Sequence, residues 1–477
     1  MQLNINDQTI LASDVEPTET VLSYLRRSGL TGTKEGCASG DCGACTIMVG
    51  RTHGGETQYH TINSCIAPIS QYASHHIVTV EGLAEKNGNL NPVQQAMVDC
   101  HGSQCGFCTP GFVMSLTALS EDNSNLPTDS AQRLEKVREA ISGNLCRCTG
   151  YRPILDAGLQ ALNSPAPGIK PPSRVPDPST TDLPGGFYQP ASIAELNAAI
   201  QQAPEARRIA GGTDLMLEVT QLYREFSGLI DLTQVPELLV LEENEAHLTI
   251  GAAVPYTQIE DFFSARSPQL VKLLHRLGSK QIRNSGSIGG NLANGSPIAD
   301  MPPILMSWDT TLQVGNAEGR QRDISIMDFY RGYRDVDLNP DEYIVSVTIP
   351  IAAVNRYHRF YKNSKRIEDD ISSVMGAFSF ELDNQLIKTA RIAYGGMAAT
   401  PIRLIEVEET LIGQTITPDL IDAACDTASK LLTPMTDVRA SAEYRKAMAL
   451  QMLARALRES HGETFLDITE VALGAGS

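Results

Sequence analysis

Eight of the ten cysteines fall into two sets of four, and both sets lie within the first 148 residues. In the first set, C-x4-C-x2-C is followed by 19 residues and a last cysteine, which is the spacing of plant-type [2Fe-2S] proteins. The loop is rich in small residues, which lets backbone amides approach the sulfides. A structural zinc site is the alternative, although such sites usually use paired C-x2-C hooks. The set consists of Cys37, Cys42, Cys45 and Cys65.

The second set has a C-x2-C pair, 37 intervening residues and a C-x-C pair. A C-x-C pair is uncommon in zinc ribbons, so we predict a second [2Fe-2S] cluster and keep zinc as the alternative. Pro110 and Pro153 follow the two pairs at positions suited to a first helical turn, and a helix N-terminus favours the negative charge of a thiolate cluster. The set consists of Cys105, Cys108, Cys146 and Cys148.

Two glycine-rich stretches could bind a phosphate, although neither G-x-G-x-x-G between a strand and a helix nor a P-loop occurs. The first is residues 211–215, after a strand-like segment. The second is residues 285–291, and it continues to Ser296 and Pro297, which read as an N-cap followed by a first-turn proline. Glycine loops at a helix start can cradle an anion. From the residues alone, tight turns explain these glycines equally well.

Composition narrows the possible partners and the compartment. The 477 residues, 42% hydrophobic and 20% charged, predict a globular chain of three or four domains. The formal charge of -18 disfavours nucleic acid and anionic lipid as partners. The N-terminus lacks the apolar stretch of a signal peptide, and no run of about 18 apolar residues occurs. We therefore expect a soluble cytoplasmic protein that does not bind a membrane.

The periodicity predicts the elements that carry these residues. Strands are expected at 3–6, 45–50 and 77–80, with a helix from Thr20 to Gly29, and four helices at 94–100, 112–119, 134–141 and 154–162. Seven prolines in residues 164–186 indicate an extended linker, after which strands and helices alternate. The expected domains are 1–85, 86–163, the linker 164–186, 187–350 and 351–477. His75 and His76 are expected in a solvated turn.

Three segments together resemble the iron-sulfur domains of the molybdenum hydroxylases: KEGCASGDCGACT at 34–46, QCGFCTPG at 104–111 and GNLCRCTGYR at 143–152. Residues 211–215 and 277–300 are similar to the FAD-binding domain of the xanthine dehydrogenases within that family, and residues 367–371 and 391–396 to its C-terminal flavoprotein domain. The resemblance implies a multidomain α+β fold. Its parts would be a ferredoxin-like β-grasp domain, an all-α helical bundle, an α+β FAD-binding domain and a C-terminal α+β flavoprotein domain.

The resemblance also implies two [2Fe-2S] clusters and FAD as cofactors, with no catalytic residue on this chain beyond the flavin. The implied FAD contacts are Ser287, Gly290, Asn291 and Asp300, with Leu277 and Gly278 alongside. The implied diphosphate cradle is Ala210, Gly211, Gly212, Thr213, Asp214 and Leu215. Family order would place the second cysteine set next to molybdenum, with Gln104 on the pterin side, and the first set next to FAD.

The activity implied is that of the small subunit of a two-subunit xanthine dehydrogenase, in which purine oxidation (hypoxanthine and xanthine to urate) takes place on another chain. The molybdopterin would sit on that large subunit, expected in an α2β2 heterotetramer, and NAD would accept the electrons from FAD. One alternative is the electron-transfer part of another molybdenum hydroxylase acting on aldehydes or N-heterocycles. A redox sensor would need an effector module, and none stands out. A basic run at Arg359, Lys362, Lys365 and Arg366 could meet NAD phosphates, but a solvated face is the better interpretation.

Overall fold

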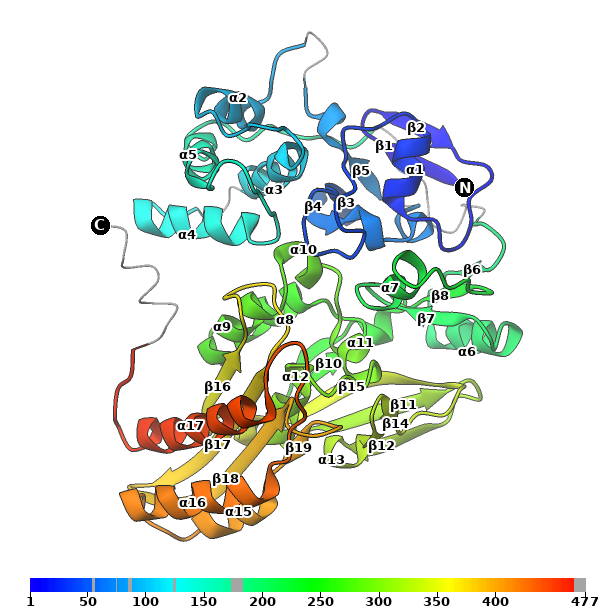
Figure 1. Cartoon of the computed structure of the whole chain (residues 1–477). Coiled ribbons are helices and arrows are strands. Elements are labelled where there is room, and N and C mark those ends of the chain that lie inside the picture. Colours follow the sequence, from blue (N-terminus) through cyan, green and yellow to red (C-terminus); the bar gives the residue numbers. More distant parts are fainter. Residues whose placement is uncertain (54–55, 74, 85–87, 123–125, 173–182, 467–477) are drawn as a thin grey trace. The chain divides into compact units, whose positions relative to one another are not determined.

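The computed structural model describes residues 1–477 except 54–55, 74, 85–87, 123–125, 173–182 and 467–477 (Figure 1). The chain forms two compact units, and each is described by itself. Unit 1 contains residues 1–235 and 278–286, and unit 2 contains residues 236–277 and 287–477. The short segment 278–286 therefore belongs to unit 1 although the chain on both sides of it belongs to unit 2.

Unit 1 begins with a five-stranded sheet in the order β2-β1-β5-β3-β4, in which only β1 and β5 pair in parallel. Helix α1 (Val21–Arg27) starts after Thr20, whose side chain accepts the amide N–H of Ser23 and caps the helix. The cap and the strand near the N-terminus confirm the sequence prediction. The strands are β1 (Gln2–Ile5), β2 (Gln8–Leu11), β3 (Thr46–His53), β4 (Glu56–Asn63) and β5 (His76–Val78).

The predicted helical bundle is confirmed, and its helices bury one apolar face each around Phe112, Val137 and Ile154. The helices are α2 (Pro92–Asp99), α3 (Thr109–Glu121), α4 (Ser130–Ile141) and α5 (Arg152–Ala161). Helix α3 starts directly after Cys108 and α5 starts at Arg152, so both cysteine pairs precede helix starts, as the prolines indicate. Unit 1 also holds a parallel sheet of β6 (Phe187–Tyr188), β8 (Leu229–Asp231) and β7 (Arg207–Ile209), with α6 (Ile193–Gln202), α7 (Leu215–Thr220) and α10 (Lys280–Arg283).

Unit 2 contains two antiparallel sheets. The first has the order β12-β11-β15-β10-β9 and packs with helices α8 (Tyr256–Phe263), α9 (Pro268–Leu277), α11 (Ile288–Ala293) and α12 (Met301–Ser307). Its strands are β9 (Leu241–Glu243), β10 (His247–Gly251), β11 (Thr311–Asn316), β12 (Gln321–Ser325) and β15 (Glu342–Pro350). Helix α13 (Ile326–Phe329) and the hairpin β13 (Tyr330–Gly332) and β14 (Asp335–Val336) follow β12.

The second sheet of unit 2 has the order β16-β17-β18-β19, and alternate residues of β17 face different cores. Met375 and Ala377 join the core around Trp308, whereas Val374 and Phe378 join the core under the C-terminal helices. The strands are β16 (Tyr357–Asn363), β17 (Val374–Asp383), β18 (Leu386–Gly395) and β19 (Ile402–Arg403), and the helices are α14 (Ile351–Val354), α15 (Ile405–Leu411), α16 (Pro418–Leu431) and α17 (Ala442–Ser460). The multidomain α+β prediction is confirmed.

The histidine prediction is wrong. His75 and His76 are buried, and His76 bonds through its two ring nitrogens to the hydroxyl of Tyr59 and the carbonyl of Asn6. Strand β5 runs between β1 and β3, so residues at its start lie inside the sheet and not in solvent. Within the described part of the chain, every helix is too short or too polar to cross a membrane.

Candidate cluster and flavin sites

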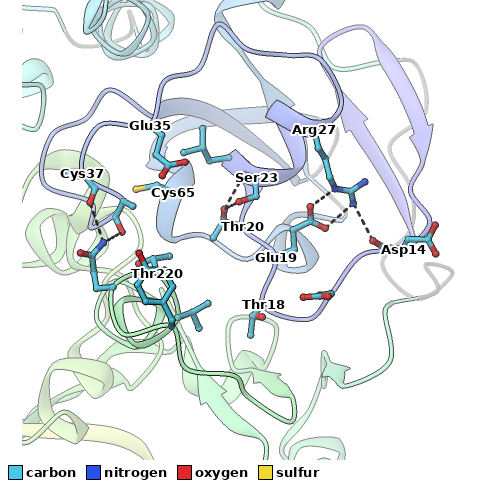
Figure 2. A pocket seen from close by; sticks show the side chains of 16 residues that line it. Asp14, Thr18, Glu19, Thr20, Ser23, Arg27, Glu35, Cys37, Cys65 and Thr220 are labelled. Carbon is cyan, nitrogen blue, oxygen red and sulfur yellow. Dashed lines mark hydrogen bonds and ion pairs between the residues drawn. The ribbon is translucent and has the colours of Figure 1, made fainter.

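The first cysteine set converges at one point of unit 1. Cys37, Cys42 and Cys45 lie in the loop between α1 and β3, and Cys65 lies in the short turn after β4. Figure 2 shows Cys37 and Cys65 of this set. The thiols of Cys42 and Cys65 donate to Cys37 and lower its pKa, and Cys45 and Cys65 also share a hydrogen bond. The amide of Ser39 points at the sulfur of Cys37, with N and Sγ 3.4 Å apart. Four thiols in mutual contact, with a backbone N–H donor to sulfur, fit a [2Fe-2S] cluster.

The second set also converges. Cys105 and Cys148 share one hydrogen bond, and Cys108 and Cys146 share another. The backbone amide of Phe107 donates to the sulfur of Cys105 and lowers the pKa of that thiol. Burial raises the pKa of the Cys146 thiol, but hydrogen bonds from the hydroxyl and then the backbone amide of Thr149 outweigh it and lower the pKa. Cys105 and Cys148 are exposed, as is the neighbouring Gln104.

One backbone hydrogen bond joins the two cysteine loops. The amide of Leu145, next to Cys146, donates to the carbonyl of Cys42 with N and O 3.0 Å apart. The side-chain amide of Asn144 donates to the neighbouring carbonyl of Gly43 at 3.0 Å. Cys42, a predicted ligand of the first cluster, is therefore hydrogen-bonded to the residue that precedes Cys146, a predicted ligand of the second.

The first glycine loop, residues 210–215, packs on the first cysteine set. The carbonyl of Ala210 accepts a hydrogen bond from the side chain of Gln71 at 2.8 Å. Gly212 has φ +71°, and a Cβ there would lie 3.2 Å from the carbonyl oxygen of Ile66, the residue after Cys65. The loop predicted to cradle a diphosphate therefore lies next to the turn that supplies a predicted cluster ligand.

The second glycine loop lies in unit 2 from Ser287 onward, and Ser287 caps α11 by accepting the amide N–H of Gly290 at 3.2 Å. A Cβ on Gly290 would meet only the hydroxyl of Ser287, at 3.1 Å, and would otherwise point into open space. The side-chain oxygen of Asn291 is buried and has no hydrogen-bond partner among the described residues. The open space beside Gly290 and the buried acceptor oxygen of Asn291 therefore fit a bound molecule such as FAD.

The expected helix start at Ser296 and Pro297 is wrong. Helix α11 has already ended at Ala293, and α12 begins at Met301 with Asp300 as its N-cap residue. The capping serine of this loop is Ser287, and the prolines that start α12 are Pro302 and Pro303. The motif reading failed because a Ser-Pro pair also fits the turn that connects two short helices.

Asp300 is held by two partners inside unit 2. Its Oδ2 lies 2.5 Å from Nζ of Lys362, and its Oδ1 accepts a hydrogen bond from the hydroxyl of Ser372. The side chains of Lys362 and Asp300 are 1% and 6% exposed, so the solvated interpretation of the basic run is wrong at Lys362. Each carboxylate oxygen keeps a lone pair for a further donor, and the contact of Asp300 with a flavin stays a prediction.

The other three basic residues of this run also have partners. Arg359 pairs with Glu459, Arg366 pairs with Asp370, and Nζ of Lys365 donates to the carbonyl of Val438. The alternation of β16 could have indicated that Lys362 is buried, because it lies two residues after the buried Phe360 on the same face.

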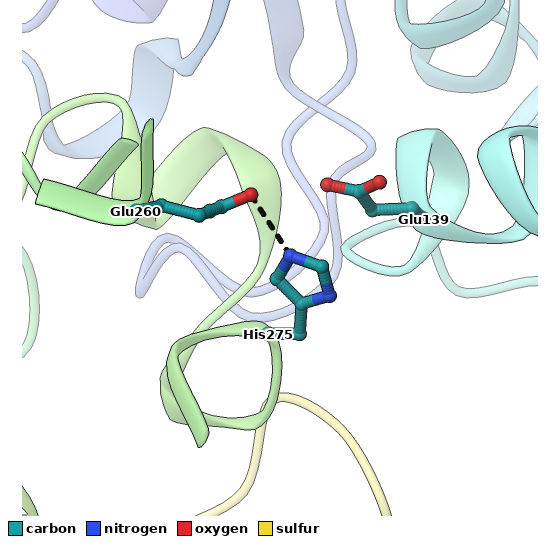
Figure 3. A group of neighbouring side chains, drawn as sticks. All are labelled: Glu139, Glu260 and His275. Atoms are coloured by element: carbon teal, nitrogen blue, oxygen red, sulfur yellow. Dashed lines mark hydrogen bonds and ion pairs between the residues drawn. The ribbon is translucent and has the colours of Figure 1, made fainter. Parts of the chain in front are cut away.

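In the same unit, His275 lies 2.8 Å from Glu260 and joins α9 to α8, a pair that the sequence did not indicate (Figure 3).

Comparison with known families matches four consecutive domains. Residues 3–70 match the 2Fe-2S iron-sulfur cluster binding domain, and residues 79–159 match a [2Fe-2S] binding domain. Residues 181–352 match the FAD binding domain in molybdopterin dehydrogenase, and residues 359–460 match the CO dehydrogenase flavoprotein C-terminal domain. The chain belongs to the molybdenum hydroxylase family. It combines two iron-sulfur domains and a flavin-binding region for electron transfer.

Relatives and solved structures agree with this assignment. Xanthine dehydrogenase 1 of Arabidopsis thaliana is 31% identical over 90% of this chain and 37% of its own length, and xanthine dehydrogenase of Emericella nidulans is 33% identical over 94% and 38%. The chain thus spans well under half the length of these relatives. Carbon monoxide dehydrogenase from Hydrogenophaga pseudoflava matches 57% of this chain and 95% of its own with a TM-score of 0.54 at 27% identity. Quinoline 2-oxidoreductase from Pseudomonas putida 86 matches 59% and 98% with a TM-score of 0.53, also at 27% identity.

Proposed function

We propose that this chain is the electron-transfer subunit of a xanthine dehydrogenase, working with a separate subunit that binds molybdopterin. The order would run from that partner to the second cysteine set, then to the first set, to FAD and finally to NAD. Iron-sulfur clusters transfer single electrons and FAD transfers either one or two, so these cofactors supply the exchange between one-electron and hydride chemistry. The observation that carries the proposal is the hydrogen bond between Leu145 and Cys42, which connects the two complete cysteine sets.

The residues of this chain would then have distinct tasks. Backbone amides at Ser39, Phe107 and Thr149 donate to cysteine sulfurs, and such donors stabilise the negative charge of a cluster. The implied FAD contacts would hold the flavin, and the open position at Gly290 and the Asn291 oxygen, which has no partner among the described residues, would face it.

The exposed side of the second set fits a partner. Cys105 and Cys148 are exposed, and the apolar side chains of Phe107 and Leu145 beside them are 47% and 46% exposed. Electron transfer requires the donor to approach the cluster closely, and exposed apolar side chains around two ligand cysteines favour burial by another protein. We expect the molybdopterin subunit to cover this surface, with Gln104 on the pterin side.

The substrate is assigned from the relatives. The curated relatives named above are xanthine dehydrogenases, whereas the structures named are a carbon monoxide dehydrogenase and a quinoline oxidoreductase. Sequence identity is higher for the former, which favours a purine over other substrates. An electron-transfer subunit for another heterocycle or an aldehyde is the second candidate, supported by the quinoline enzyme.

The test separates electron transfer from substrate oxidation. The purified chain should oxidise NADH in the presence of an artificial dye, because that reaction needs only FAD and the clusters. With xanthine and NAD it should show no turnover until the molybdopterin subunit is added. Xanthine oxidation by the chain alone would refute the division of labour, and a reconstituted pair that oxidises quinoline but not xanthine would favour the second candidate.

A further inference from the structure

Residues 278–286, here called the bridge segment, are anchored in unit 1 by buried polar side chains. Gln281 is 1% exposed, and its Nε2 lies 3.1 Å from Oγ1 of Thr46, 3.3 Å from Oγ of Ser115 and 3.3 Å from Oδ1 of Asn144. Thr46 directly follows Cys45, and Asn144 lies two residues before Cys146. A single side chain of the bridge segment therefore contacts residues next to both cysteine sets.

The backbone at this junction is packed so closely that larger residues would not fit. A Cβ on Gly43 would lie 2.2 Å from the carbonyl oxygen of Gly143, and a Cβ on Gly143 would lie 2.3 Å from Oε1 of Gln281. Such separations are far below van der Waals contact. The bridge segment, the first cysteine loop and the residues that follow α4 are therefore in direct backbone contact.

A buried arginine provides the second anchor. The side chain of Arg283 is fully buried, and it donates to the carbonyl of Gly278 at 2.7 Å and to Oε1 of Glu139 on α4 at 3.3 Å. Lys280 lies 3.7 Å from the same carboxylate, and Asn284 donates to the carbonyl of Thr61 at 2.8 Å. A buried guanidinium needs such partners, because an uncompensated charge in the interior is strongly destabilising.

The far end of the bridge segment touches the first flavin loop. A Cβ on Gly211 would lie 1.7 Å from the carbonyl oxygen of Ser285, so the two backbones are in direct contact and only glycine fits. Gly211 belongs to the loop that we propose as the diphosphate cradle. The contacts thus run without interruption from Asn144 through Gln281 and Ser285 to Gly211.

We propose that the bridge segment is a positioning device that couples FAD affinity to the cluster loops, with Gln281 and Arg283 as its positioning residues. The proposal rests on the FAD site proposed above. When the anchors are weakened, the loop at 210–215 samples other arrangements. The apparent affinity for FAD then falls, because only a fraction of the molecules holds the loop in the arrangement that binds FAD. The coupling is reciprocal, so FAD binding should in turn order the junction between the cluster loops.

The test compares anchor variants with matched controls. Gln281→Met keeps the size of the side chain but removes its hydrogen bonds, and Glu139→Gln removes the charge that faces Arg283. Controls are Gln160→Met on the exposed side of α5, and Glu135→Gln on α4, whose carboxylate pairs only with the exposed Arg138 in the described contacts. The dissociation constant of FAD, measured from flavin fluorescence, should rise about tenfold or more in both anchor variants and stay unchanged in both controls. Iron content should stay at that of the wild-type protein.

Hydrogen exchange of the wild-type protein supplies a readout that needs no variant. FAD should slow amide exchange at residues 281–286 and at Asn144 and Leu145, although none of these residues is proposed to touch FAD. Unchanged FAD affinity in both folded anchor variants would refute the coupling, as would unchanged exchange at the junction. If the wild-type protein fails to bind FAD at all, the proposed function fails instead, so the two failures are distinguishable.

Discussion

Replacing Lys362 should destabilise unit 2 far more than replacing any exposed lysine. Lys362→Met removes the cation from a pair whose side chains are 1% and 6% exposed, with Nζ and Oδ2 2.5 Å apart. Asp300 then remains charged and buried. The hydroxyl of Ser372 still donates to it, but a neutral donor does not cancel its charge. Leaving one member of a buried pair uncompensated costs about 3–5 kcal/mol.

The size of unit 2 converts this free energy into a melting shift. For a unit of 150–250 residues each kcal/mol changes Tm by about 2–4 °C, so Lys362→Met should lower the midpoint by about 6–20 °C. Trp308 is the single tryptophan of the chain, is fully buried and stacks on Phe263 inside unit 2. Tryptophan fluorescence therefore reports the unfolding of unit 2 alone. The protein should be free of FAD, because a bound ligand adds its own stabilisation.

Two further variants test the reasoning. Lys388→Met removes an exposed lysine from its pair with Asp383, where the side chains are 49% and 53% exposed, and should leave the midpoint within experimental scatter. The double variant Lys362→Met with Asp300→Asn should be more stable than Lys362→Met alone, since no uncompensated charge remains. A midpoint for Lys362→Met equal to that of the wild-type protein, or simple additivity in the double variant, would refute a buried ion pair.

Three further outcomes are expected. The purified protein should hold the iron of two spectroscopically distinct [2Fe-2S] centres, and Cys148→Ser should abolish the signal of only one of them; stoichiometric zinc at either set would contradict this. Gly290→Leu should release FAD and keep iron, because the side chain would enter the open cradle beside Ser287; a variant that retains FAD with unchanged affinity would show that the cradle serves another ligand. A negative charge introduced beside the second set, as in Gln104→Glu, should weaken association with the molybdopterin subunit, measured by titration calorimetry, without changing NADH oxidation by the isolated chain.

Elements that depend on local chemistry could be predicted from the sequence. Helix α5 spans Arg152–Ala161, close to the predicted 154–162, and Thr20 caps α1 as expected, because periodicity and capping act within a few residues. The cysteine sets were readable for a related reason. A [2Fe-2S] cluster needs four thiolates in loops of limited reach, so its ligands leave a characteristic spacing in the sequence.

The pairs that hold the flavin region could not be predicted, because their members are far apart in sequence. Lys362 and Asp300 are separated by 62 positions, and Gln281 and Thr46 by 235. A lysine or a glutamine is usually solvated, and the residues next to it in the sequence do not indicate a contact with a distant residue. The same limitation explains His76, whose partners on β4 and after β1 appear only once the sheet has formed.

The contrast between clusters and flavin follows from which atoms each cofactor uses. A cluster binds side-chain sulfur, and only cysteine provides it, so the residue type identifies the site. A diphosphate binds backbone amides, which every residue except proline offers, so the sequence indicates such a loop only by its glycines, as at Gly211 and Gly290.

A glycine in these loops can have either of two structural roles, and the sequence does not distinguish them. At Gly211 the missing side chain leaves room for the carbonyl of Ser285, whereas at Gly290 the space is open and can be filled by a ligand. The two loops look alike in sequence, and only their surroundings show that substitution at Gly211 should disrupt the protein itself, whereas substitution at Gly290 should act on what it binds.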